Sequence, residues 1–208
     1  MPKSLTGWET SSLSISMATF RSSLSTPSAS SLAPAPLAAL LADRDPLRGA
    51  SADLSLRLAA LRGDRQAAAQ AHRPALERIR TEAKRLAAAA PRPTQGQTQV
   101  QLDPAQLLAL AYPDRIGLRR PGDAPRWLLS GGKGAVIDAA DPLAGQRLLV
   151  AADLDGDTRE ARIRLALPIA EGALREVLGD RIGWVQVAEW SRRERRVIAR
   201  EQERLSSA

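Results

Sequence analysis

The spacing of apolar residues predicts helices over residues 36–90. An apolar run opens at Leu37–Leu41, and a second begins after Asp53 and ends at Gly63. From Pro74 to about residue 90, apolar residues recur every three or four positions, which gathers them on one face of a helix. Aspartate before a helix, proline in its first turn and glycine just after its end are residues that helix boundaries favour.

Residues 102–167 predict a short helix followed by strands. Asp103 and Pro104 start the helix, which we expect to continue irregularly through Asp114–Leu118. Beyond Pro121 the period becomes that of strands. We predict four strands, at Arg126–Ser130, Ala135–Asp138, Gln146–Leu154 and Ala161–Leu167. In the last of them, Ile163, Leu165 and Leu167 share one buried face, and arginines alternate with them on the wet face.

The C-terminal part predicts a helix at Gly172–Leu178 and then a pair of strands around a polar turn at Ser191–Glu194. In this pair we expect two valines of the first strand to face two apolar residues of the second: Val185 and Val187 against Val197 and Ala199. A charged helix over Arg192–Arg204 also fits these residues.

Two segments predict no regular structure. The first 31 residues hold 11 Ser and 4 Thr and no periodic apolar pattern, so we expect residues 1–33 to be disordered. Proline and glycine make residues 91–101 a linker between the helices and the strands.

Composition excludes several classes of site and suggests an anionic partner. The chain has no Cys and one His, which rules out disulfides, thiolate metal sites and cysteine nucleophiles. No run of about 18 apolar residues occurs, so we expect a cytoplasmic protein without a membrane span. The formal net charge is +7. Residues 40–100 carry 11 basic and 6 acidic groups, whereas residues 101–170 carry 9 of each, so the excess lies on the helical half.

Three short motifs have simpler structural interpretations. The sequence from Gly131 to Gly134 contains Lys133 but lacks the hydroxyl residue and the helix of a phosphate loop, and a hairpin turn is favoured. The run Asp153–Asp157 departs from calcium-loop spacing and is typical of a turn between strands. His72 has no nucleophile partner and is expected to be a solvated residue at the start of a helix.

The residues between Leu107 and Leu167 resemble the C-terminal region of HrpB-type bacterial DEAH-box helicases. The matching elements are Ala111–Ile116, Ser130–Ala135, Leu149–Gly156 and Ala161–Ala166. Upstream, Leu37–Leu47 and Asp53–Leu58 are similar to the helicase-associated helical domain of that family. Downstream, Val187–Trp190 and Arg195–Arg200 resemble the start of its C-terminal domain.

The resemblance implies an α+β chain with an N-terminal helical bundle fragment, a small OB-like antiparallel β-barrel and a C-terminal hairpin. The implied divisions are a helicase-associated segment at 34–90, a linker at 91–101, an OB-like domain at 102–182 and a truncated C-terminal β domain at 183–208. Residues 1–33 do not resemble the family. Both RecA-like motor domains of the family have no counterpart here, so we expect no catalysis and no cofactor in this chain, while the parent helicase uses ATP and magnesium.

The resemblance implies that this chain is an accessory portion of an ATP-dependent RNA helicase that contacts single-stranded RNA or DNA. Its other implied partners are the helicase motor domains. The candidate contacts to the phosphate backbone are Arg115, Arg119, Arg120 and Lys133. Two alternatives remain open, a protein-interaction module whose Ala-rich helices dock on a partner, and a non-functional gene fragment or frameshifted product.

Overall fold

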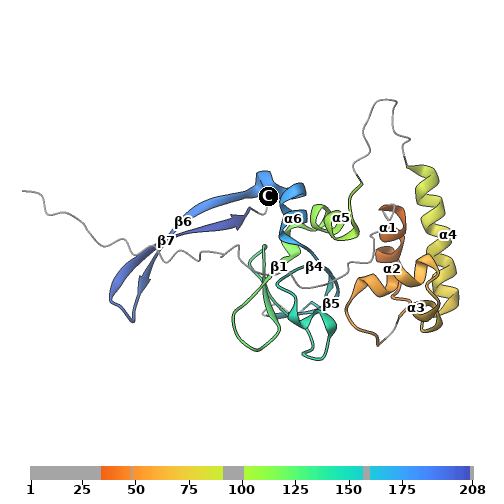
Figure 1. The fold of residues 1–208 in the computed structure, drawn as a ribbon, viewed down its shortest axis with the longest axis horizontal. Helices are drawn as coiled ribbons and strands as arrows, with labels where there is room; N and C mark the ends of the chain where they lie inside the picture. Colours follow the sequence, from red (N-terminus) through yellow and green to blue (C-terminus); the bar gives the residue numbers. More distant parts are fainter. Residues whose placement is uncertain (1–33, 48, 91–100, 157–159, 207–208) are drawn as a thin grey trace, which may run out of the picture.

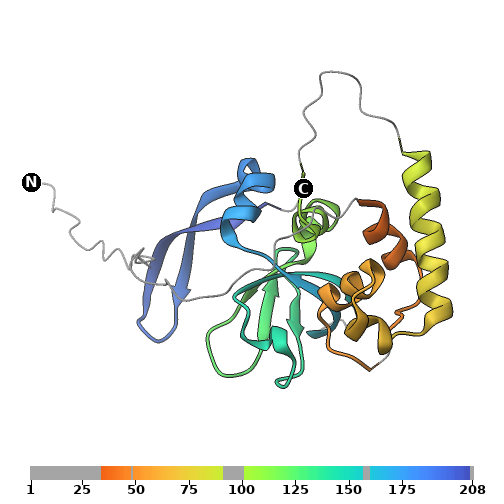
Figure 2. The same ribbon diagram turned by 45° about the vertical axis from the view of Figure 1, so that its right-hand side comes forward.

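The computed structural model describes residues 34–47, 49–90, 101–156 and 160–206. The segment predicted to be disordered, 1–33, and residues 91–100 of the predicted linker lie outside the described residues. The fold is mixed α+β: helices lie on one side, a barrel in the middle and a long hairpin on the other side (Figures 1 and 2).

The predicted helical region forms four helices, α1 (Pro34–Ala42), α2 (Leu54–Arg62), α3 (Arg65–Ala69) and α4 (Arg73–Ala89). Asp53 caps α2 by accepting a hydrogen bond from the backbone N–H of Ser55. Gly63 ends the same helix at φ +93°, a left-handed conformation that glycine adopts without steric cost. Helix α3 was not predicted. None of its residues is buried, so its sequence carries no periodic apolar pattern from which a helix can be predicted.

The predicted strand region forms a closed five-stranded barrel. The short helix α5 (Pro104–Ala111) and a single 3-10 turn at Pro113–Arg115 lead into its first strand. The strands are β1 (Ile116–Arg119), β2 (Arg126–Leu129), β3 (Gly134–Val136), β4 (Leu148–Leu154) and β5 (Glu160–Pro168). They follow the closed order β1-β2-β3-β5-β4, in which only the β3–β5 pairing is parallel.

One prediction about this region is wrong. The helix expected to continue through Asp114–Leu118 ends at Arg115, because Ile116–Arg119 pairs with both β2 and β4 and closes the barrel. The buried and wet sides predicted for the last strand of the barrel are confirmed, since Ile163, Leu165 and Leu167 are all buried and Arg162 and Arg164 are exposed. The pairing of β4 with β5 shifts register next to Ile163, so Ile163 lies in the barrel interior, whereas the two leucines pack against the helices.

The buried residues form two clusters on either side of the barrel wall. The inner cluster is centred on Trp127, which is fully buried and donates its indole N–H to the carbonyl of Gln146 at 3.1 Å. The outer cluster joins the outward faces of β4 and β5 to α1, α2, α4, α5 and α6 (Glu171–Leu178). The helical segment and the barrel therefore share one core, which holds them in a fixed arrangement.

The connection between α1 and α2 is fastened to the barrel through Ala52. The N–H of Ala52 donates to the Asp141 carboxylate at 2.7 Å, and its carbonyl accepts from the N–H of Ala166 at 2.9 Å. The guanidinium of Arg57, which is 2% exposed, binds the same connection by donating to the carboxylate of Asp45 and to three backbone carbonyls.

The last two strands, β6 (Ile182–Ser191) and β7 (Arg196–Leu205), form a separate antiparallel hairpin. The predicted strand pair is confirmed, and a helix over Arg192–Arg204 is excluded. The expected side-chain pairs are wrong, because the register places Val197 opposite Trp190 and Ala199 opposite Ala188. The turn occupies Arg192–Arg195 and is displaced by one residue from the predicted Ser191–Glu194, because Ser191 still pairs with Arg196 in the ladder.

Candidate nucleic-acid interface

The structure places the four predicted contact residues at two opposite ends of the barrel. Arg115 precedes β1, whereas Arg119 and Arg120 lie where that strand ends. Lys133 follows β2, which runs antiparallel to β1, and the N–H of Gly131 in the same turn donates to the carbonyl of Asp114 at 2.9 Å. Lys133 therefore lies near the Arg115 end, and the other two arginines lie one strand length away.

Arg115 is largely occupied by contacts within the protein. Its guanidinium lies over the ring of Tyr112, 4.7 Å from the centroid, and its Nη1 donates to the carbonyl of Ala152 at 3.1 Å. A weaker ion pair links it to Asp114 at 3.9 Å. These contacts fix the junction between α5 and the barrel, and they leave Arg115 less available to an external phosphate than an exposed arginine.

Arg119 and Arg120 lie in a group of four arginines that the strand pairing gathers at one end of the barrel. The N–H of Arg119 donates to the carbonyl of Arg147 at 2.8 Å, and the N–H of Arg120 donates to the carbonyl of Arg126 at 2.8 Å. We call Arg119, Arg120, Arg126 and Arg147 the barrel-end arginines. They come from the β1–β2 connection and from the residue before β4, so their proximity follows from long-range pairing and not from spacing in the sequence.

The barrel-end arginines differ in how far they are neutralised. Arg126 pairs with Glu160 at 3.4 Å, and Arg147 pairs with Glu171 at 2.7 Å. Hydrogen bonds from Arg147, and then from Arg175, hold the pKa of the Glu171 carboxyl below its usual range, so this acid stays ionised against Arg147.

The other two barrel-end arginines have donors to spare. Within the described residues, Arg120 is exposed and forms no ion pair. Arg119 reaches only the carbonyl of Asp123, at 3.5 Å, and its Nε is buried without a hydrogen-bond acceptor in the described structure. This end of the barrel therefore offers the exposed guanidinium of Arg120 and the Nη donors of the half-buried Arg119 to an external anion, whereas the Arg119 Nε is inaccessible.

The turn that contains Lys133 does not fit a nucleotide phosphate. Gly132 adopts φ +86°, as a hairpin turn requires, and the prediction of a turn is confirmed. The chain continues directly into β3, with Ala135 fully buried at the position where a phosphate loop carries its magnesium-binding hydroxyl. There is no helix N-terminus here to bind a phosphate, so these residues do not form a site for ATP and magnesium.

The other motifs also have structural roles. Asp155 fastens the β4–β5 turn by accepting from the N–H of Arg162 at 2.7 Å, as expected for a connecting turn, while Asp157 lies outside the described residues. His72 precedes α4, is exposed and makes no capping hydrogen bond with its side chain. Within the described ranges no three potential metal-ligating side chains gather into a site.

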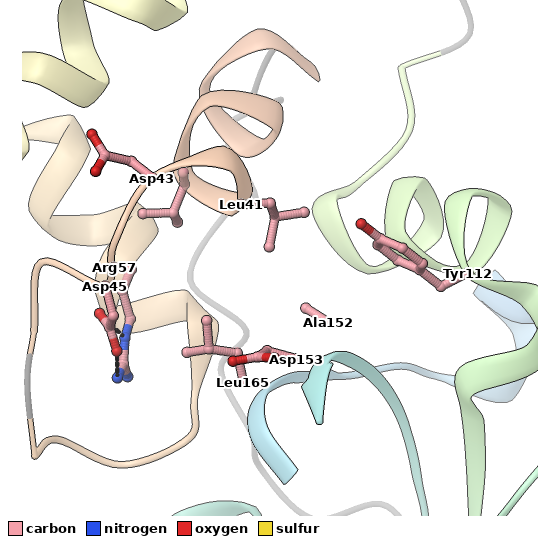
Figure 3. Close-up of a pocket in the computed structure, with 9 residues that line it drawn as sticks. Leu41, Asp43, Asp45, Arg57, Tyr112, Ala152, Asp153 and Leu165 are labelled. Carbon is pink, nitrogen blue, oxygen red and sulfur yellow. Dashed lines mark hydrogen bonds and ion pairs between the residues drawn. The ribbon is translucent and has the colours of Figure 1, made fainter. Parts of the chain in front are cut away.

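A cavity of about 150 Å³ lies where the helical segment meets the barrel (Figure 3). Tyr112 from the end of α5 points toward Leu41 across it, and the Arg57–Asp45 ion pair lies on its other side. Its lining includes the carboxylates of Asp43, Asp45 and Asp153. Three acidic side chains against one arginine repel a phosphate, so this cavity is not the nucleic-acid site.

A second hollow lies on the outer surface of the helices, between α3 and α4. It has a volume of about 430 Å³, and its lining includes Arg65 of α3 and Arg73 of α4. Arg80 also lines it but is held by Glu77 and by two backbone carbonyls of α2. The sequence placed the charge excess on this half of the chain, and the hollow shows where part of that charge gathers.

Comparisons with known proteins relate this chain to one part of a bacterial helicase. No protein-family model and no curated protein matches the sequence. Among solved structures, it is similar to the crystal structure of the Escherichia coli DExH-box NTPase HrpB, with 27% identity and a TM-score of 0.55 over 82% of this chain. A second structure, of the Escherichia coli DEAH/RHA helicase HrpB, has 22% identity and a TM-score of 0.54 over the same share, and it supports the fold alone.

The matched region is a small portion of those proteins. The chain spans 19% of the length of each HrpB structure. The resemblance to this helicase that the sequence suggested is confirmed at that level, as a helicase-related portion. Within the described residues no helix is long and apolar enough to cross a membrane.

Proposed function

We propose that this chain is an accessory portion of an ATP-dependent helicase, and that its barrel contacts single-stranded nucleic acid. The observation that carries the proposal is the gathering of the barrel-end arginines at one end of the barrel, in a chain that is similar to part of HrpB. In this proposal ATP hydrolysis belongs to the motor domains of the parent helicase, and it is supported by the turn at Gly131–Gly134, which lacks the hydroxyl residue and the helix of a phosphate loop.

We assign the barrel to the OB type. Support comes from its pairing: β1 is shared between β2 and β4, and β3 lies parallel to β5. In OB domains the face of strands 2 and 3 and the β1–β2 and β4–β5 loops bind oligonucleotides. Arg120 lies in the β1–β2 loop of this chain, next to Arg119, so the unpaired guanidinium groups occupy the position that the assignment predicts.

The binding chemistry is electrostatic. Arg119 and Arg120 hold phosphates of the strand, and Arg126 and Arg147 contribute a positive field that Glu160 and Glu171 partly cancel. The aromatic stacking groups of many single-strand-binding barrels are absent from the described strands of this barrel, where the one tryptophan, Trp127, is buried in the core. Affinity at this surface therefore depends strongly on salt and weakly on sequence.

The experiment is a fluorescence-anisotropy titration of labelled oligouridine with the full chain at several salt concentrations. Each phosphate contact to a single strand contributes about 0.7 to the slope of log K against log salt. The variant Arg119→Gln/Arg120→Gln should lower that slope by about 1.4. The control Arg62→Gln/Lys84→Gln removes the same charge from exposed positions on α2 and α4. An equal effect of both variants, or no binding by the unaltered chain at low salt, contradicts the proposal.

A protein-interaction role is the second candidate, and one feature favours it. Leu118 and Leu128 face each other across β1 and β2 on the outside of the barrel, and they are 49% and 44% exposed. Two adjacent exposed leucines are typical of a surface that contacts another domain, such as the helicase motor. If the chain has this protein-interaction role, the variant Leu118→Ser/Leu128→Ser should no longer capture motor domains in a pull-down, while its affinity for oligouridine stays unchanged.

A further inference from the structure

The tip of the β6–β7 hairpin lies at the end of an arm that has few contacts with the rest of the chain. At the base, Ile182 pairs with Leu205, which packs against the outer core cluster, and Arg175 of α6 binds Glu203 at 2.6 Å. The strands then run for ten residues each and leave the body of the molecule (Figures 1 and 2). At about 3.4 Å per residue, Trp190 lies roughly 27 Å from Ile182 along the strand.

A solvent-exposed tryptophan lies beside this tip. Trp190 is 62% exposed, and its cross-strand partner Val197 is 61% exposed, so the indole lacks the cover that a tryptophan of this size normally receives. The cross-strand pair with Val197 contributes only modestly to stability and leaves most of the ring uncovered. The exposed ring therefore presents a flat π surface to something outside the described chain.

The tip is also the most positive short segment of the hairpin. Residues 190–197 contain four arginines against one glutamate, a net charge of +3. Arg196 is neutralised by Glu194 at 2.6 Å, whereas Arg192, Arg193 and Arg195 are exposed and form no ion pair with any described residue. Three unpaired guanidinium groups next to an open indole match a ligand with phosphates beside unstacked bases.

The backbone at the tip is strained at one of these arginines. Arg195 has φ +52°, the only positive φ among the described residues that are not glycine. Glycine or asparagine would occupy this left-handed position with less strain. An arginine in a position that disfavours it is the kind of local cost that structures retain at functional sites.

We propose that this tip is a second single-stranded nucleic-acid contact, in which a base stacks on Trp190 and flanking phosphates bind Arg192, Arg193 and Arg195. The inference rests on the proposed function for the class of ligand, but it uses different residues. The tip and the β1–β2 loop both lie toward the lower edge of Figures 1 and 2, so both contacts are presented on the same side of the molecule. A duplex has no open base faces along its length and cannot use the ring in this way.

A tryptophan on the same strand provides the matched control. Trp184 is 70% exposed and lies on the same face of the hairpin as Trp190, but it pairs with Glu203 near the base, far from the three arginines. Removing Trp184 takes away a similarly exposed indole and leaves the tip intact. For charge, the control is Arg44→Gln/Arg62→Gln/Lys84→Gln, which removes three exposed positive groups from the helical segment.

The test measures binding of labelled single-stranded oligouridine, and of a duplex of the same length, to the full chain by anisotropy. Trp190→Ala should weaken single-strand binding at least about fivefold, the effect of losing one stacked base, and Trp184→Ala should weaken it less than twofold. Arg192→Gln/Arg193→Gln/Arg195→Gln should lower the salt slope by about 2, against no comparable change in the charge control. Duplex binding should be the same for Trp190→Ala and the unaltered chain.

A substitution at position 195 separates binding from folding. Arg195→Gly relieves the positive φ, so the thermal midpoint of the chain should stay level or rise while single-strand affinity falls severalfold. A fall in affinity accompanied by a loss of stability would contradict a direct contact.

The outcomes also separate this inference from the proposed function. If Arg119→Gln/Arg120→Gln weakens binding and the tip variants do not, the tip inference fails and the barrel proposal stands. If only the tip variants weaken binding, the tip inference stands and the barrel assignment fails. Loss of motor-domain pull-down by Trp190→Ala with unchanged oligouridine affinity would identify the tip as a protein contact and overturn the inference.

Discussion

Of the substitutions considered, we expect one at Arg57 to lower the stability of the folded chain most. Its Nε and Nη2 donate to the Asp45 carboxylate at 3.1 and 2.7 Å, and its remaining donors reach the carbonyls of Ser51, Asp53 and Leu47. With the side chain 2% exposed, one guanidinium holds the connection that joins the helices to the barrel. We predict that Arg57→Met, which keeps the apolar stem and removes the donors, destabilises the whole chain.

The magnitude follows from the groups that the substitution leaves unpaired. Removing one partner of a buried ion pair costs about 3–5 kcal/mol, because the other partner remains desolvated. Asp45 is 32% exposed, so water can restore part of its solvation and the expected loss is at the lower end, about 3 kcal/mol. With a urea dependence of about 2 kcal/mol per molar, the unfolding midpoint should fall by about 1.5 M.

Urea unfolding followed by circular dichroism measures this loss. The control is Arg78→Met, because Arg78 also binds an aspartate, Asp43, at 3.2 Å but is 56% exposed. A surface pair of this kind contributes about 0–1 kcal/mol. Equal destabilisation by the two substitutions, or a loss below about 1 kcal/mol for Arg57→Met, would refute the reasoning that burial and the three carbonyls make Arg57 an anchor.

Two further predictions concern the barrel wall and its pH dependence. A Cβ on Gly117 would lie 3.1–3.2 Å from side-chain atoms of Trp127, Leu129 and Leu149. Gly117→Ala should therefore lower the free energy of unfolding in urea by about 1–3 kcal/mol. An unchanged urea midpoint would contradict this prediction, because it would mean that the barrel interior accommodates the added methyl group. The pKa of Glu171 is lowered in the folded chain, so its contribution to stability is present above its ordinary pKa of 4.5 and is lost as the pH falls through the lower folded value. Thermal midpoints measured between about pH 7 and pH 3 should therefore fall less steeply for Glu171→Gln than for the unaltered chain, and identical slopes would contradict the ion-pair assignment.

Helix boundaries were the part of the fold that the sequence predicted best. Asp53 and Asp103 cap helices, and Gly63 ends one, because these roles depend on side chains and φ angles within a few residues. The strand β1 was missed for the opposite reason. It has four residues, with Gly117 in the middle, and its strand conformation depends on pairing with β2 and with β4, which lies about thirty residues away in the sequence.

The candidate site was predictable only in part. Arg119 and Arg120 were among the four candidate contacts to the phosphate backbone, and the structure places these two together at one end of the barrel. Arg126 and Arg147 were not identified, because only the antiparallel pairing of β1 with its two neighbours brings their backbones alongside. Charge counted along the chain cannot reveal groups that assemble through strand register.

The most direct test of the central claim is photo-cross-linking of 4-thiouridine-substituted oligouridine to the full chain, followed by mapping of the modified peptides. The proposed function predicts cross-links in the β1–β2 connection, residues 119–126, that disappear at high salt. Cross-links confined to the α3–α4 hollow, residues 65–80, or no cross-links at low salt, would contradict a nucleic-acid contact at the barrel end.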